Sequence, residues 1–111
     1  MNPLKKVEVT IFGRLRLEHM LGQSKFETLK EMADMLDLMK IIKLTDTMRT
    51  DFVVTDEATK MVGIRTENAK TPTCVEMTTT QMASLKKFIE GWKGGFDLSD
   101  DWILDLVSQL S

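Results

Sequence analysis

The chain has 111 residues, and its 15 lysines and arginines against 17 aspartates and glutamates give a net charge of −2. An apolar fraction of 42% is enough to build a core and excludes a fully disordered chain, and no apolar run approaches the ~20 residues of a membrane span. The single cysteine, Cys74, excludes an intrachain disulfide, and the near-neutral charge argues against a dedicated duplex-DNA binder.

This length predicts one domain over residues 1–111. A lone thiol fits a reducing compartment, and the N-terminus lacks the apolar stretch of a signal peptide, so we expect a cytoplasmic protein. The chain has no nucleophile, phosphate-loop or metal motif, and we therefore expect no enzyme activity, no cofactor and no metal. A pair of His19 and Cys74 is the one catalytic alternative, although surface and strand roles explain both residues. The small size and single domain of the chain are also typical of proteins of phages and mobile elements.

Residues 5–18 alternate between apolar and polar side chains. The alternating apolar positions are Val7, Val9, Ile11, Leu15 and Leu17. This period of two predicts a half-buried strand over the whole segment. Gly13, in the middle of it, predicts a bulge or bend in that strand.

Residues 26–42 predict a helix that is apolar over a wide arc. Ser24 and Glu27 form a capping box in front of it. One face carries Leu29, Met32, Ala33, Leu36 and Met39, and the arc is widened by Met35, Leu38 and Ile42. Such a helix is usually buried on two sides, so we expect the second side to form the subunit interface of a homodimer.

Residues 50–77 predict three strands, at 51–55, 60–66 and 73–77, joined as a meander. Thr78 and Gln81 form a second capping box before a helix that ends at Gly94 and Gly95, and Ser99 is expected to cap a last helix. The predicted fold is α+β: an antiparallel meander sheet of about four strands with two to three helices packed on one face, in the order β-α-β-β-β-α-α.

Residues 96–111 form an acidic amphipathic tail with four aspartates and no basic residue. Its apolar side either closes the core of this protein or makes the tail a separable interaction helix that docks on a partner. Gly94 and Gly95 would also permit two copies to exchange their tails. The candidate protein-interaction residues are Phe96, Trp102, Ile103, Leu106 and Leu110 of the tail, with Met35 and Leu38 of the first helix.

An alternative function uses the solvent face of the predicted first strand. Lys6, Phe12, Arg14 and Arg16 lie there and combine positive charge with an aromatic ring. Single-stranded nucleic acid is bound by such a combination, through stacking and phosphate contacts. A solvated face, or one paired with the acidic tail, explains the same residues without a ligand.

The strand–strand–strand–helix order of residues 50–93 ends in the segment MTTTQMASLK at 77–86. In this order the chain resembles the end of the transcriptional coactivator p15-type single-stranded DNA-binding proteins. The resemblance covers less than half of the chain, and the basic strands of that family are missing from this stretch. The resemblance implies binding of single-stranded DNA, which agrees with the alternative function described above.

Taken together, these features favour a small protein without catalysis of its own. We expect it to bind another protein, as a regulator, inhibitor or assembly factor, and to form a homodimer. Nucleic acid is the alternative partner, and a membrane is not expected.

Overall fold

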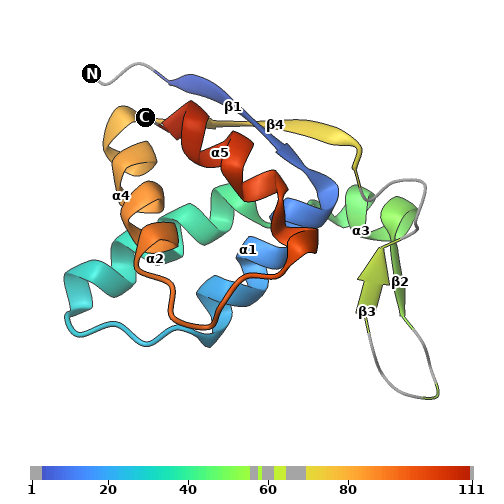
Figure 1. Ribbon diagram of the computed structural model, residues 1–111, viewed down its shortest axis with the longest axis horizontal. Helices are drawn as coiled ribbons and strands as arrows, with labels where there is room; N and C mark the ends of the chain where they lie inside the picture. The colour runs from blue at the N-terminus through green and yellow to red at the C-terminus, as the bar shows by residue number, and fades with distance from the viewer. Residues whose placement is uncertain (1–3, 56–57, 59–61, 65–69, 111) are drawn as a thin grey trace.

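The computed structural model describes residues 4–55, 58, 62–64 and 70–110. Its elements in chain order (Figure 1) are β1 (Lys5–Thr10), α1 (Ile11–Gln23), α2 (Leu29–Ile42), α3 (Asp46–Phe52), β2 (Val53–Thr55), β3 (Val62–Ile64), β4 (Pro72–Met77), α4 (Thr79–Glu90), the 3₁₀ helix η2 (Leu98–Asp100) and α5 (Trp102–Leu110). The fold is α+β, and helices make up most of it.

Strands from opposite ends of the chain form the main β ribbon. β1 and β4 run antiparallel, with Val7 opposite Val75. The buried side chains of the ribbon are Val7, Val9, Val75 and Met77. The residues between them, such as Glu8 and Glu76, are exposed. One face of the ribbon therefore packs on the helices, with α5 lying against β1, and the other face meets solvent (Figure 1).

The predicted four-stranded meander with two to three helices is wrong, and the described residues form five α-helices. A strand overlaps each of the three predicted ranges between residues 50 and 77, but β2 pairs with β3 alone and β4 pairs with β1. Both sheets of the described residues thus have two strands. Figure 1 shows β2 and β3 beside α3, apart from the β1–β4 ribbon. Alternation within a segment identifies a strand but not its partner, which explains the error.

The predicted strand over residues 5–18 is wrong beyond Thr10, where a helix begins. The Thr10 hydroxyl accepts a hydrogen bond from the Gly13 amide at 2.9 Å and caps α1. Ile11, Arg14 and Leu17 lie three residues apart on the buried side of this helix. Arg14 is charged, so the buried side of α1 does not appear in the sequence as apolar residues at a period of 3.6. The apolar residues alone therefore show a period of two.

Two other helix starts differ from the predicted ones. α2 is capped by Thr28, whose hydroxyl accepts from the Glu31 amide at 3.1 Å, whereas Ser24 lies at the end of α1. Ser99 was expected to cap the last helix. Instead, the carboxylate of Asp97 caps the short helix η2, which precedes α5. In both cases several capping residues stand close together, and packing selects among them.

α3 was not predicted from the sequence. The Thr45 hydroxyl accepts from the Met48 amide at 3.2 Å at its start, and Asp46 lies in its first turn. A threonine followed by an acidic residue is a helix-start signal that could have revealed it.

The capping box that begins α4 is confirmed. Thr78 and Gln81 exchange hydrogen bonds between side chain and amide at 2.9 and 3.1 Å. Leu85 and Ile89 then enter a single core, shared by the ribbon and by helices α1, α2, α4 and α5. Its buried members are Val7, Val9, Leu17, Met20, Leu21, Leu38, Ile42, Val75, Met77, Leu85, Ile89, Trp102, Ile103, Leu106 and Leu110.

Gly13 allows close contact between α1 and Trp102 of α5. A Cβ atom at Gly13 would lie 2.8 Å from Cε3 of Trp102 and 3.0 Å from Cγ1 of Val9. Phe12 packs edge-on against the same indole, with ring centroids 6.5 Å apart. Gly13 is therefore not a bend in a strand. Its missing side chain leaves room for the indole.

Gly13→Ala should lower the free energy of unfolding, because the added methyl group must displace Trp102 or Val9. Overpacking of this kind typically costs about 1–3 kcal/mol, against a gain of roughly 1 kcal/mol in helix propensity. Urea denaturation followed by tryptophan fluorescence measures the difference. Gly22→Ala in the same helix is the control, since its Cβ would meet only Cε of Met39 at 4.0 Å and should be neutral or stabilising. Equal effects of the two substitutions would refute the steric account.

Candidate interaction surfaces

Most of the predicted interaction residues of the tail lie inside the protein. Trp102, Ile103, Leu106 and Leu110 are all buried in the core. The end of α5 is also tied to β1, because the Gln109 amide group accepts from the Glu8 N–H at 2.7 Å and donates to its carbonyl at 2.9 Å. This arrangement favours the interpretation in which the tail closes the core of this protein over the one in which it is a separable interaction helix. Phe96 lies outside it, with 51% of its surface exposed.

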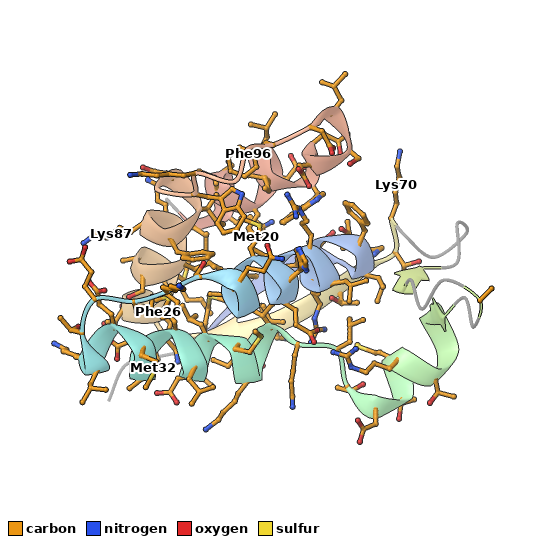
Figure 2. The ribbon with its side chains drawn as sticks, turned by 90° about the horizontal axis from the view of Figure 1, so that it is seen from below. Met20, Phe26, Met32, Lys70, Lys87 and Phe96 are labelled. Carbon is orange, nitrogen blue, oxygen red and sulfur yellow. The ribbon has the colours of Figure 1, made fainter. Side chains whose placement is uncertain are left out.

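The two apolar faces of α2 differ in burial. Leu38 and Ile42 are fully buried, and Met35 is partly buried. On the opposite face Leu29, Met32 and Leu36 are 81%, 49% and 52% exposed, and Ala33 is exposed as well. The spacing of these four residues places them in one line along the helix. We call Leu29, Met32, Ala33 and Leu36 the outer stripe. Figure 2 shows Met32 on the outside of α2.

The sequence thus identified both faces of α2 but not which of them enters the core. Leu38, expected at an interface, is a core residue of this chain. Met35 instead lines a hollow of about 540 Å³ between α2 and α4, together with Phe26 and Phe88. Lysines and acidic residues both line this hollow, so its charge selects no particular ligand.

Arg14 is a buried residue that joins three segments. Its Nε donates to the Ile42 carbonyl at 2.8 Å, and Nη2 donates to the Lys43 carbonyl at 2.9 Å, at the end of α2. Its Nη1 donates to the Thr73 hydroxyl of β4 at 3.2 Å. Burial lowers the pKa of Arg14 below its ordinary value, and the negative charge of Glu18 opposes that shift. The guanidinium stays charged at neutral pH and complements the negative end of the α2 dipole.

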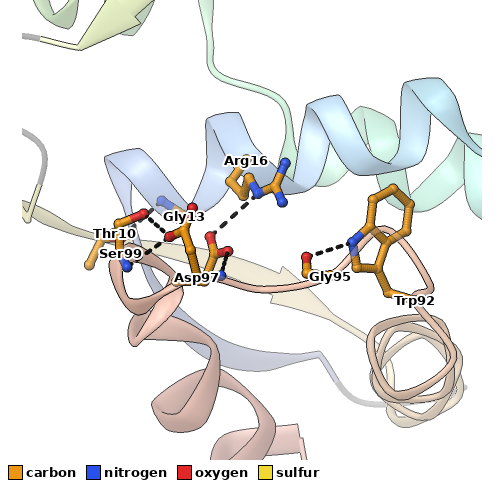
Figure 3. A network of polar contacts seen from close by, with 8 residues as sticks. Thr10, Gly13, Arg16, Trp92, Gly95, Asp97 and Ser99 are labelled. Atoms are coloured by element: carbon orange, nitrogen blue, oxygen red, sulfur yellow. Dashed lines mark hydrogen bonds and ion pairs between the residues drawn. The ribbon is translucent and has the colours of Figure 1, made fainter.

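Arg16, also on α1, pairs with the acidic tail. Its Nε lies 3.4 Å from Oδ1 of the buried Asp100 (Figure 3). The other oxygen of Asp100 accepts from the Asp97 amide at 3.1 Å, and the Asp97 carboxylate accepts from the Ser99 amide at 2.8 Å. Hydrogen bonds from the Ser99 hydroxyl and amide lower the pKa of Asp97 below its ordinary value of 3.8, so this exposed carboxylate is charged at neutral pH.

The residues considered for nucleic-acid binding do not share a face. Lys6 is exposed on β1, whereas Arg14 and Arg16 lie on α1 and bind groups of the protein itself. Phe12 packs against Trp102. Their placement on one solvent face of a strand is wrong, because the strand ends before three of the four.

His19 and Cys74 lie on different elements. His19 is exposed on α1 and lines a hollow that also includes Glu18 and Arg49, which form an ion pair. Cys74 is exposed on β4. Within the described part of the chain, no group of three or more histidines, cysteines and acidic residues could hold a metal ion. No helix there is long and apolar enough to cross a membrane.

No protein-family model, curated protein or solved structure matches this chain. The resemblance to single-stranded DNA-binding proteins is carried by the capped helix α4 alone, because the strands expected before it do not form one sheet. The two exposed apolar regions, on α2 and around Phe96, are therefore interpreted from their own geometry.

Arg14→Lys should lower the free energy of unfolding by about 2–3 kcal/mol. The guanidinium donates hydrogen bonds to Ile42, Lys43 and Thr73 at once, and an ammonium group cannot reproduce this planar arrangement of donors. Chemical denaturation measures the loss. Arg16→Lys is the matched control at a partly exposed ion pair and should cost less than about 1 kcal/mol. Similar losses for both variants would contradict the role assigned to Arg14.

Proposed function

We propose that the protein acts without catalysis, by binding proteins as a regulator, inhibitor or assembly factor, and that it associates with a second copy of itself through α2. The outer stripe is the observation that carries the proposal. Three large apolar side chains and Ala33 stay exposed on a helix whose opposite face enters the core through Leu38 and Ile42. Neighbouring exposed apolar side chains of this kind often mark a binding surface.

The outer stripe is complementary to itself about its centre. In an antiparallel pair of α2 helices with a two-fold axis between residues 32 and 33, Leu29 of one copy faces Leu36 of the other. Met32 then faces Ala33, whose small side chain lets the helices approach and leaves room for the flexible thioether. The same four residues on both copies would thus form one isologous contact.

The helix dipoles support the antiparallel orientation. Antiparallel pairing sets the two dipoles of α2 in opposition, so that the positive end of each helix lies near the negative end of the other. A parallel pair would bring like ends of the two dipoles together.

The area of the stripe limits the strength of this contact. A stable interface of standard size buries about 800 Å² on each partner, which four side chains cannot supply. Polar residues beside the stripe would complete the contact as a rim. We therefore expect a weak dimer that dissociates on dilution.

Light scattering on a sizing column, over a range of protein concentrations, measures the association. The wild-type mass should rise from monomer toward dimer as the concentration increases. Leu36→Glu should remain monomeric, because its carboxylate would be buried against Leu29 of the second copy without a partner. In the monomer the new carboxylate precedes Lys40 by one turn, a pairing that stabilises a helix, so unfolding would not explain the loss.

Leu104→Glu is the matched control. Leu104 is 75% exposed on α5, which lies across the molecule from α2 (Figure 2), and this variant should associate like the wild type. A wild-type protein that is monomeric at every concentration, or a Leu36→Glu variant that still dimerises, would rule out the α2 interface.

A further inference from the structure

A groove between α4 and α5 gathers exposed apolar side chains away from α2. Its volume is about 400 Å³, and its apolar floor is formed by Ile89, Ile103 and Val107. Phe96, Leu98 and Leu104 line it as well, and they are 51%, 96% and 75% exposed. We call this feature the tail groove. Figure 2 shows Phe96 on the side of the molecule opposite Met32.

The polar lining of the tail groove is acidic. It includes Glu90, Asp97, Asp100 and Asp101, and no lysine or arginine is among its lining residues. The charge of Asp100 is paired inside the protein, and Lys86 lies 3.9 Å from Glu90. Asp97 and Asp101 are exposed and form no ion pair within the described residues. An apolar surface flanked by two carboxylates outside these ion pairs therefore faces solvent.

The segment that bounds the groove is held by its own contacts. Nε1 of Trp92 donates to the Gly95 carbonyl at 3.2 Å (Figure 3), and Gly95 has a φ of +85°, which favours glycine. A Cβ atom at Gly94 would lie 2.6 Å from Cε2 of Trp92, so the chain wraps closely around the indole. The backbone that leads to Phe96 is thus held before a partner arrives, which reduces the entropy cost of binding.

We propose that the tail groove binds a cationic amphipathic segment of another protein. Apolar anchors of that segment would cover Leu98, Leu104 and the floor of the groove, while lysine or arginine side chains would meet Asp97 and Asp101. An amphipathic helix with anchors one turn apart matches this arrangement. The inference rests on the proposed protein-binding role but uses a different face from the outer stripe, so each can fail alone.

Charge distinguishes this partner from other occupants. Nucleic acid and anionic lipid surfaces are negative and would be repelled by the carboxylates of the groove. The tails of two copies would also repel each other, because residues 96–111 contain no basic side chain. A cationic segment gains from apolar burial and from the attraction of opposite charges, which also speeds association.

The test uses a fluorescein-labelled helical peptide of about 18 residues, with leucines along one face and lysines elsewhere. The full chain is titrated into it, and fluorescence anisotropy reports binding. A scrambled peptide of identical composition controls for attraction by charge alone. We expect the amphipathic peptide to bind about tenfold more tightly than the scrambled one, and its affinity to fall as salt is added.

Variants of the chain then locate the binding face. Replacing both Leu98 and Leu104 with serine changes only exposed side chains and should weaken binding about tenfold. Asp101→Asn should weaken binding less and reduce its dependence on salt. Leu36→Glu, which alters the outer stripe, should bind the peptide like the wild type even where its self-association is lost.

Equal affinity for both peptides, or undiminished binding by the Leu98 and Leu104 double variant, would overturn the tail-groove proposal and leave the α2 interface untouched. Loss of peptide binding in Leu36→Glu would overturn it too, because the peptide would then occupy the outer stripe. Direct binding of a fluorescein-labelled single-stranded oligonucleotide to the full chain, weakened in the Leu98 and Leu104 double variant, would also overturn the proposal and would point to nucleic acid as the ligand of this face.

Discussion

The buried guanidinium of Arg14 determines where α2 ends and how it meets the rest of the fold. It donates to the carbonyls of Ile42 and Lys43 from α1, and it reaches β4 through the Thr73 hydroxyl. With the end of α2 held there, Leu38 and Ile42 enter the core, and the outer stripe remains on the opposite side of the same helix. The exposure of that stripe is therefore a consequence of how the core is built.

The acidic tail has an inner and an outer side with different roles. On the inner side Trp102 and Leu106 complete the core, and Asp100 pairs with Arg16 and helps to fold the turn before α5. On the outer side Leu98 and Leu104 stay exposed beside the carboxylates of Asp97 and Asp101, which form no ion pair with the residues that the structure describes. The pairing with Arg16 removes one charge from the tail but leaves its surface acidic. A segment that closes the core can in this way also present a surface selective for cationic partners.

Local signals predicted those parts of the fold that a single segment determines. The capping box of Thr78 and Gln81 placed α4, and residue spacing revealed both apolar faces of α2. The pairing of β1 with β4 depends on residues far apart in the chain, so no local pattern could reveal it. Arg14 resembled a surface residue, because its burial depends on the carbonyls at the end of α2. For the same reason, spacing alone could not show that Leu38 faces inward, nor separate the exposed Leu98 from the buried part of the tail.

The central claim is that the outer stripe of α2 contacts a second copy of the chain. Methyl-labelling of the nine methionines gives NMR probes on this surface and in the core at once. Met32 is half exposed in the stripe, whereas Met20 and Met77 are fully buried. In a dilution series, the Met32 methyl signal should shift with protein concentration while the signals of Met20 and Met77 stay constant. A Met32 signal that does not change with concentration would contradict the account.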